Sequence, residues 1–193
     1  MKRKGNILRE TKETSIKLSL DLDGKGNGEI DTGIGFMDHM LESFSRHGRF
    51  DLTVLARGDL GVDMHHTIED LGIVLGNAIR DAVGEGKGIE RFADVSVPMD
   101  EALAETVLDV GGRGYLVWNA DLPGNVSGIP PDLFEHFFYS MCINACITAH
   151  ISAYGLNSHH VAEAIFKSFG IALHRAVRIG SDDRTVPSTK GTF

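Results

Sequence analysis

Two adjacent histidines followed three residues later by a glutamate occur twice in the chain, each time at the start of an apolar pattern with helical spacing. The two copies are HHTIE at residues 65–69 and HHVAE at residues 159–163. A glycine also follows each glutamate by seven residues, at Gly76 and Gly170. One such pair would say little, but two copies in one register predict a duplicated metal-binding framework.

Helix geometry limits how each motif can bind a metal. With about 3.6 residues per turn, neighbouring histidines point about 100° apart, so one doublet does not easily serve one ion. His65 and Glu69, at i and i+4, share a face, but His66 and Glu69, at i and i+3, can also pair. Spacing leaves both pairings open, and the same holds for residues 159–163. The plainer alternative is a solvated first helical turn, where a glutamate suits the helix dipole.

Two further histidines hold equivalent places in the two halves of the chain. His39 precedes the first doublet by 26 residues and His136 precedes the second by 23. These histidines complete eight donors, enough for two ions with four ligands each: His39, His65, His66, Glu69, His136, His159, His160 and Glu163. Imidazole and carboxylate donors suit a divalent transition metal, but sequence does not separate manganese, iron and zinc. Asp38 and Asp70 are candidates to orient the histidines, with a simply solvated carboxylate as the alternative for either.

The apolar pattern predicts strands, a helix, a strand and a second helix in each half. In the first half we expect antiparallel strands within residues 5–32, a helix over 36–47 that Gly48 ends, a strand over 50–56 and the first His-His helix. In the second half, strands over 95–97, 104–110 and 115–120 precede a loop over 122–131, a helix over 132–146, a strand over 147–153 and the second His-His helix. Residues 104–110 also permit a helical start. We therefore expect one α/β (α+β) domain over 1–193, made of halves at about 1–88 and 89–193.

Composition narrows the class of protein. Hydrophobic residues at 42% and charged residues at 24% are ordinary for a soluble globular domain. The net charge of −8 argues against a nucleic-acid partner. The basic start lacks the apolar core of a signal peptide, and no apolar run is long enough to span a membrane. Cys142 and Cys146, spaced i and i+4, are expected to face the interior as thiols, and the chain is expected to be cytoplasmic.

Eight segments of the chain bear on its family: GFMDHML at 35–41, RHG at 46–48, DMHHTIED at 63–70, PMDE at 98–101, EHFF at 135–138, NSHH at 157–160, FK at 166–167 and PSTKG at 187–191. Together these segments resemble the imidazoleglycerol-phosphate dehydratase family of histidine biosynthesis. The resemblance runs from about Arg9 to Gly191, and no fused phosphatase-like domain is present. In one departure, Leu156 stands where many relatives carry a lysine, which puts the local charge or the subunit contacts near the metal site in question.

The resemblance implies a fold and an assembly. The fold has two similar halves, each a mostly antiparallel four-stranded sheet with two helices, and the four helices pack between the sheets. The assembly is a homo-oligomer of 24 subunits with two Mn²⁺ per active site, and the sites lie between subunits. One ion takes His65, Glu69, His136 and His160. The other takes His39, His66, His159 and Glu163, so the resemblance favours the i, i+4 pairing.

The resemblance also assigns residues to the substrate. The positions that match substrate and phosphate binding are His47, Arg91, Arg113, Lys167, Ser188 and Lys190. Arginine holds phosphate through two parallel hydrogen bonds, and a negatively charged chain needs local positive charge to recruit a phosphoester. Glu13 matches the catalytic acid/base position.

The implied reaction dehydrates D-erythro-imidazole glycerol phosphate to imidazole acetol phosphate. In the expected mechanism two metals stabilise the imidazolate, the ring expels the neighbouring hydroxyl to form a diazafulvene, and a carboxylate removes the carbon 2 proton. The alternative is a dinuclear metal-dependent phosphoester hydrolase, which would release phosphate. A non-catalytic metal-storage shell would explain the histidines but not Glu13 and the cations.

Overall fold

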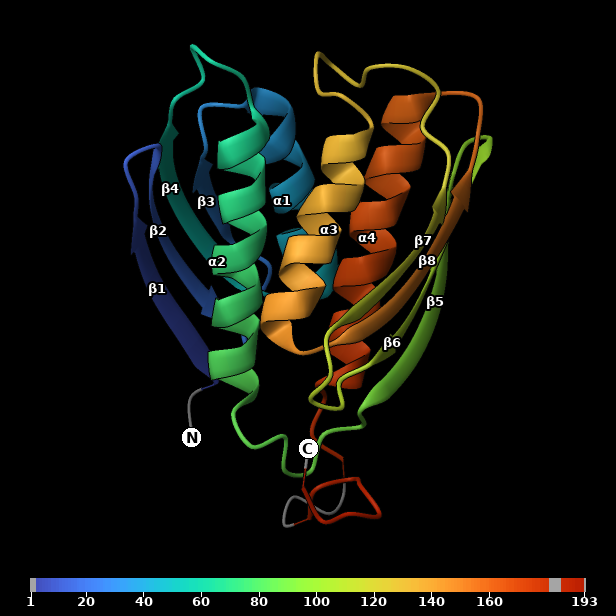
Figure 1. Ribbon diagram of the computed structural model, residues 1–193. Coiled ribbons are helices and arrows are strands. Elements are labelled where there is room, and N and C mark those ends of the chain that lie inside the picture. Colours follow the sequence, from blue (N-terminus) through green and yellow to red (C-terminus); the bar gives the residue numbers. More distant parts are fainter. Residues whose placement is uncertain (1–2, 181–184, 193) are drawn as a thin grey trace.

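The computed structural model describes residues 3–180 and 185–192, in which four helices lie between two four-stranded sheets (Figure 1). The first half contains β1 (Lys4–Glu10), β2 (Thr14–Asp21), β3 (Gly28–Asp31), α1 (Gly35–Gly48), β4 (Asp51–Gly58) and α2 (His65–Val83). The second half contains β5 (Phe92–Met99), β6 (Ala102–Asp109), β7 (Tyr115–Ala120), α3 (Asp132–Ala145), β8 (Thr148–Tyr154) and α4 (Ser158–Ala176). None of the helices among the described residues is long and apolar enough to cross a membrane.

The two sheets share one topology. Their strand orders are β1-β2-β4-β3 and β5-β6-β8-β7, and all neighbours are antiparallel except β3 with β4 and β7 with β8. The prediction of a duplicated unit with mostly antiparallel sheets is confirmed. The expectation that every strand within residues 5–32 is antiparallel is wrong for β3, because α1 crosses over between β3 and β4 and brings the chain back in the same direction. Residues 102–109 form a strand, not a helical start.

Each sheet packs one face on the helices because its strands alternate apolar and polar residues. In β2, Ile16, Leu18 and Leu20 are buried while Lys17 points outward. In β6 the buried positions are again alternate ones, from Ala102 onward. The helices therefore sit in an apolar interior that both sheets supply.

Glycines allow the helices to pack in two close pairs, α2 with α3 and α1 with α4. A Cβ atom on Gly76 would lie 2.4 Å from the carbonyl oxygen of Met141 in α3. A Cβ atom on Gly170 would lie 2.6 Å from the carbonyl oxygen of Phe44 in α1. The matched glycines therefore mark backbone contacts, and each pair joins a helix of the first half to one of the second. All four helices begin at the same end of the molecule (Figure 1).

Helices α1 and α3 end within one residue of the predicted positions, but the residues at these ends differ in role from what we expected. Gly48 is the last residue of α1, and Arg49 takes the left-handed conformation (φ 57°). Gly48 is required by packing instead, since its Cβ would lie 2.9 Å from the carbonyl oxygen of Gly170. At the end of α3, Cys146 is left-handed (φ 56°) and only partly buried. Both thiols are free, but only Cys142 faces the interior as predicted, and burial raises its pKa to about 12.

Candidate metal centres and active site

The first cluster joins α2 to α3 and consists of His65, Glu69 and His136. Glu69 lies one turn after His65, so that its Oε2 is 3.8 Å from His65 Nε2. Its other oxygen, Oε1, is 3.5 Å from His136 Nε2. Each of the three residues offers a ligand atom within 4.8 Å of the others. The i, i+4 pair of one helix is thus completed by a histidine of the neighbouring helix.

The second cluster joins α4 to α1 in the same way and consists of His39, His159 and Glu163. The Oε2 atom of Glu163 is 3.2 Å from Nε2 of His39 and 3.2 Å from Nε2 of His159. The three ligand atoms again lie within 4.8 Å of one another. The two clusters are therefore equivalent, one on each helix pair.

Each cluster holds three of the four donors that the resemblance assigned to one ion. Both use the i, i+4 pairing, which spacing had not separated from i, i+3. The residues that stay outside the clusters are His160, from the first set, and His66, from the second. Both are the second histidine of a doublet, which points about 100° away from the first.

The clusters fit a divalent transition metal. Three imidazole and carboxylate donors converge in each cluster, a set that suits such an ion. In the first cluster, His136 Nε2 is buried and has no hydrogen-bond partner among the described residues. A buried nitrogen without a partner is costly, so its position beside Glu69 favours a ligand there.

Lys167 contacts the carboxylate of the second cluster. Glu163 is buried, and its Oε1 accepts a hydrogen bond of 2.7 Å from the Lys167 ammonium one turn further along α4. Burial alone would raise the pKa of the Glu163 carboxyl, but the hydrogen bonds from Lys167 and His39 outweigh it and hold that pKa below its ordinary value. Partial burial and the charge of Lys167 lower the pKa of His47, in the last turn of α1.

His66 and His160 each meet a carboxylate that sequence reasoning did not assign. The His66 Nδ1 atom is 3.0 Å from Asp59 Oδ2, and the His160 Nδ1 atom is 2.8 Å from Glu101 Oε2. These hydrogen bonds raise the pKa of both imidazoles, and the bond from His160 holds the pKa of Glu101 at about 2. Glu101 lies in a segment that carried the resemblance, but nothing in the sequence linked either carboxylate to a doublet.

The carboxylates that were predicted to orient histidines have other partners. Asp38 accepts hydrogen bonds from the backbone and hydroxyl of Thr32, which fixes the turn before α1. Asp70 accepts from Arg9 and from the hydroxyl of Thr14. The prediction was wrong for both because position within a helix does not reveal which strand or loop packs against it.

Glu13 lies beside the first cluster. It directly precedes β2 and is exposed, and its Oε2 atom is 3.9 Å from His66 Nδ1. It lines a small cavity of about 120 Å³ together with Arg9, Thr11, His66, Glu69 and Asp70. A carboxylate of the acid/base candidate and a carboxylate of the metal cluster therefore share one cavity.

Arg91 lies far from the clusters, near the C-terminal end of α4. Its backbone N–H donates to the carbonyl of Ala176, which is 13 residues beyond Glu163, or about 20 Å at about 1.5 Å per residue. Its guanidinium makes two hydrogen bonds to Asp109 and one of 2.7 Å to the carbonyl of Pro187.

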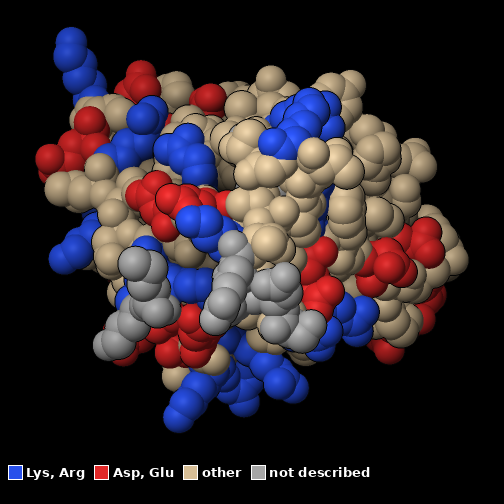
Figure 2. Space-filling view, turned by 90° about the horizontal axis from the view of Figure 1, so that it is seen from below, with Lys and Arg blue, Asp and Glu red and all other residues tan. Residues whose placement is uncertain are grey.

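Three other predicted phosphate positions lie at the same end. The Pro187 contact brings Ser188 and Lys190 there, and the backbone carbonyl of Arg113 accepts a hydrogen bond from the hydroxyl of Thr148 at the start of β8. Figure 2, seen from this end, shows lysine and arginine side chains interspersed with carboxylates. Within one chain only Lys167 and His47, of the six predicted phosphate positions, lie close to a cluster.

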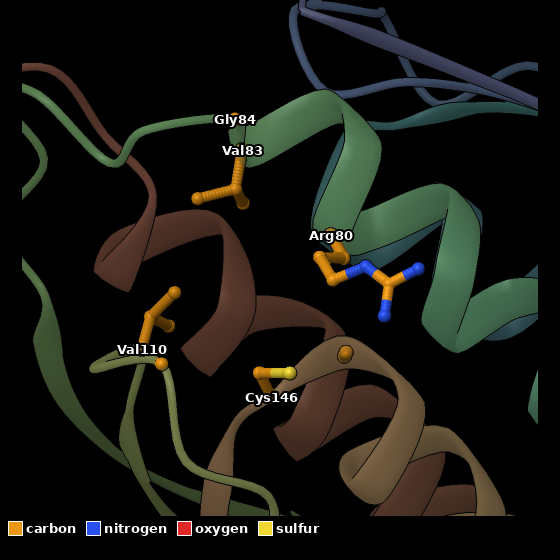
Figure 3. Close-up of a pocket in the computed structure, with 7 residues that line it drawn as sticks. Arg80, Val83, Gly84, Val110 and Cys146 are labelled. Atoms are coloured by element: carbon orange, nitrogen blue, oxygen red, sulfur yellow. The ribbon is translucent and has the colours of Figure 1, made fainter. Parts of the chain in front are cut away.

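A pocket away from the clusters lies between α2, α3 and the loop after β6 (Figure 3). Its volume is about 180 Å³, and it is lined by Arg80, Val83, Gly84, Val110, Gly112, Ala145 and Cys146. The Arg80 guanidinium donates to Asn77 within its own helix. None of the predicted site residues lines this pocket, so it is not part of the candidate site.

Comparison with known proteins decides the family. A family model described as imidazoleglycerol-phosphate dehydratase matches residues 32–173. The chain belongs to this family. Imidazoleglycerol-phosphate dehydratases of Methanoculleus marisnigri and Methanosphaerula palustris are 61% and 57% identical to it, and each match covers 99% of this chain and 100% of the relative.

Solved structures of the family have the same fold. The imidazoleglycerol-phosphate dehydratase of Staphylococcus aureus matches with a TM-score of 0.83 and 37% identity, covering 92% of this chain and 99% of that one. That of Pyrococcus furiosus, in complex with (S)-C348, matches with a TM-score of 0.82 and 33% identity, covering 97% and 100%. The chain is therefore a hydro-lyase that dehydrates imidazole glycerol phosphate in histidine biosynthesis. The phosphoester hydrolase alternative finds no support in these comparisons.

Proposed function

We propose that this dehydratase completes its active site between subunits of a homo-oligomer of 24 chains, with two Mn²⁺ in each site. The observation that carries the proposal is that, among the described residues, each cluster brings together three donors, one fewer than the four expected for an ion. His66 and His160 supply those fourth donors from neighbouring subunits. The distance of about 20 Å between Glu163 and the Arg91 end of α4 also favours a shared site, since a small substrate cannot touch both in one chain.

Within the proposed site, the chain's residues divide the work. The ions, when bound, supply the positive charge that stabilises an anionic azole ring. Arg91, Arg113, Lys167, Ser188 and Lys190, with His47, hold the substrate and its phosphate. Glu13 moves the carbon 2 proton, because its exposed carboxylate opens into the cavity beside Glu69. The phosphate stays attached, so binding it anchors the ring against the proton-transfer group.

The outer face of the second sheet supports assembly. Phe92, Val107, Tyr115 and Val117 are 60%, 50%, 62% and 36% exposed on it. Val107 and Val117 both pair with His150, so they flank this histidine from the strands on either side of β8. Exposed apolar surface of this kind is typical of an interaction site. We also propose that the two halves act as one catalytic domain and that the enzyme works in the cytoplasm.

Complementation between inactive chains tests the shared site. We expect His65→Ala and His160→Ala each to abolish turnover alone. When the two variants are co-expressed with different tags and purified as mixed oligomers, some sites receive an intact cluster from one chain and an intact His160 from the other. Random mixing restores roughly a quarter of the sites.

Two outcomes would contradict the proposal. If His65 and His160 served one ion within a single chain, mixing would restore no activity. Full turnover after exhaustive chelation would remove the metals from the reaction. Metal analysis of protein purified without added metal, together with its mass in solution, identifies the bound ion and counts the subunits.

A further inference from the structure

The second histidine of each doublet is bound to a carboxylate through the same ring atom. In both His66 and His160 it is Nδ1 that makes the hydrogen bond, at 3.0 Å and 2.8 Å. An ionised carboxylate can only accept, so Nδ1 carries the proton and donates it. In a neutral imidazole the lone pair then lies on Nε2, at the far side of the ring.

Glu101 is itself firmly held. Its second oxygen, Oε1, accepts hydrogen bonds of 3.1 Å and 2.7 Å from the backbone N–H groups of Leu156 and Asn157. These residues directly precede α4, which opens with the second doublet. Glu101 therefore joins the turn between β5 and β6 to the start of α4 and fixes the direction of the His160 ring.

Asp59 has the same relation to His66 in the other half. It lies in the loop between β4 and α2, where its carbonyl accepts a hydrogen bond of 2.7 Å from the N–H of Val62. Its side chain is 26% exposed, and that of Glu101 is 32% exposed. Both carboxylates are thus partly shielded from solvent, which strengthens their hold on the imidazoles.

We propose that Asp59 and Glu101 are positioning residues that fix the Nδ1–H tautomers of His66 and His160 and so direct each Nε2 at a metal cluster of a neighbouring subunit. This inference rests on the proposed function, because it assumes that the two histidines leave their own chain's clusters. A histidine that is a metal ligand commonly has its other nitrogen bound in this way, which fixes the ring and raises its basicity.

The comparison of the two halves also explains how Glu13 is left for proton transfer. Glu13 and Glu101 each directly precede the second strand of their half, β2 and β6. Glu101 bonds to its histidine at 2.8 Å, whereas Glu13 lies 3.9 Å from His66 Nδ1, beyond hydrogen-bond distance. Asp59 fills that place instead. The first half therefore uses a loop carboxylate to position its histidine and keeps the turn carboxylate for chemistry.

Manganese binding to the assembled enzyme tests the proposal without an activity assay. Equilibrium dialysis with Mn²⁺ alone should show that Asp59→Ala lowers the binding affinity for one of the two ions by roughly 10–100-fold. Asp59→Asn, which keeps an acceptor oxygen, should restore most of the affinity. Glu101→Ala and Glu101→Gln should behave in the same way toward the other ion. Asp100→Ala is the control and should leave the affinity for both ions unchanged. The Asp100 side chain is 79% exposed, and its Oδ2 atom lies 3.8 Å from His160 Nε2, beyond hydrogen-bond distance.

A double-mutant cycle separates positioning from a general structural role. If Asp59 acts through His66, adding Asp59→Ala to His66→Ala should weaken Mn²⁺ no further. An additive loss, or wild-type affinity in Asp59→Ala, would overturn the positioning role. If His66→Ala itself binds both ions as tightly as the wild type, the proposed function fails instead. The two failures are therefore distinguishable.

Discussion

Replacing Gly76 by alanine should push α2 away from α3. The new Cβ atom would lie 2.4 Å from the carbonyl oxygen of Met141, whereas Cβ contacts below 3.0 Å essentially do not occur. The opposing group is backbone and cannot rotate aside. The helices must therefore separate by at least about 0.6 Å, the difference between 3.0 Å and 2.4 Å. Such overpacking costs about 1–3 kcal/mol, which lowers the Tm of a chain of this length by roughly 2–12 °C.

The same displacement should reach the first cluster but not the second. His65 and Glu69 stand on α2 and His136 on α3, so their spacing depends on this helix contact. We expect Gly76→Ala to weaken the binding of Mn²⁺ at the first cluster and to leave its binding at the second cluster unchanged. Gly170→Ala, whose Cβ would lie 2.6 Å from the carbonyl oxygen of Phe44, should do the reverse because it separates α1 from α4.

Thermal unfolding measures the loss of stability in Gly76→Ala. The protein should be metal-free and held at one subunit concentration, because bound ligand and oligomerisation both shift Tm. Gly35→Ala is the matched control, because Gly35 is helical and its would-be Cβ has no atom of a neighbouring element within 4 Å in the part of the chain that the structure describes. It should be neutral or stabilising by up to about 1 kcal/mol. A Gly76→Ala protein that melts at or above this control would refute the reasoning.

Three further predictions concern single side chains. Glu13→Gln should retain Mn²⁺ and substrate in binding assays but abolish turnover, and full activity would remove Glu13 from the mechanism. Native alkylation followed by mass spectrometry should modify Cys146 but not Cys142, whose thiol is buried and whose pKa is raised to about 12, and both should react after unfolding. Backbone hydrogen bonds from Lys25 and the neighbouring turn hold the pKa of Asp51 below its ordinary value, so its contribution to stability is present at neutral pH and is lost as the pH falls through the acid range. The Tm difference between the wild type and Asp51→Asn should therefore shrink between pH 7 and pH 3; a constant difference would contradict this.

Many of the helices and strands could be predicted because the spacing of apolar residues along the chain determines them locally. Alternation in β2 and the helical spacing after each doublet gave the correct elements, and the matched motifs gave the duplication. The parallel direction of β3 could not be derived, because it depends on where the chain returns after α1. Likewise Gly48 ends α1 as predicted, but its close contact with α4 could not be derived from the sequence.

In the candidate site, too, the residues that local spacing relates could be predicted, and those that only the tertiary fold brings together could not. The i, i+4 donors lie on one helix, so spacing could propose them, and the equivalent positions of His39 and His136 pointed to the third donors. Asp59 and Glu101 come from loops of other elements, and only the packed fold brings them to His66 and His160. Asp38 and Asp70 were chosen for their sequence position next to ligands, and tertiary hydrogen bonds occupy both.

The pairing of helices across the halves has a consequence for how the chain arose. Each cluster takes two donors from one half and one from the other, so neither half alone contains a full cluster. An ancestral polypeptide of half this length, with the same elements, could have gripped a metal only as a self-associated dimer. Gene fusion would then have preserved helix contacts that already existed between two chains. After fusion the two copies could diverge, with Glu13 serving proton transfer and Glu101 positioning His160.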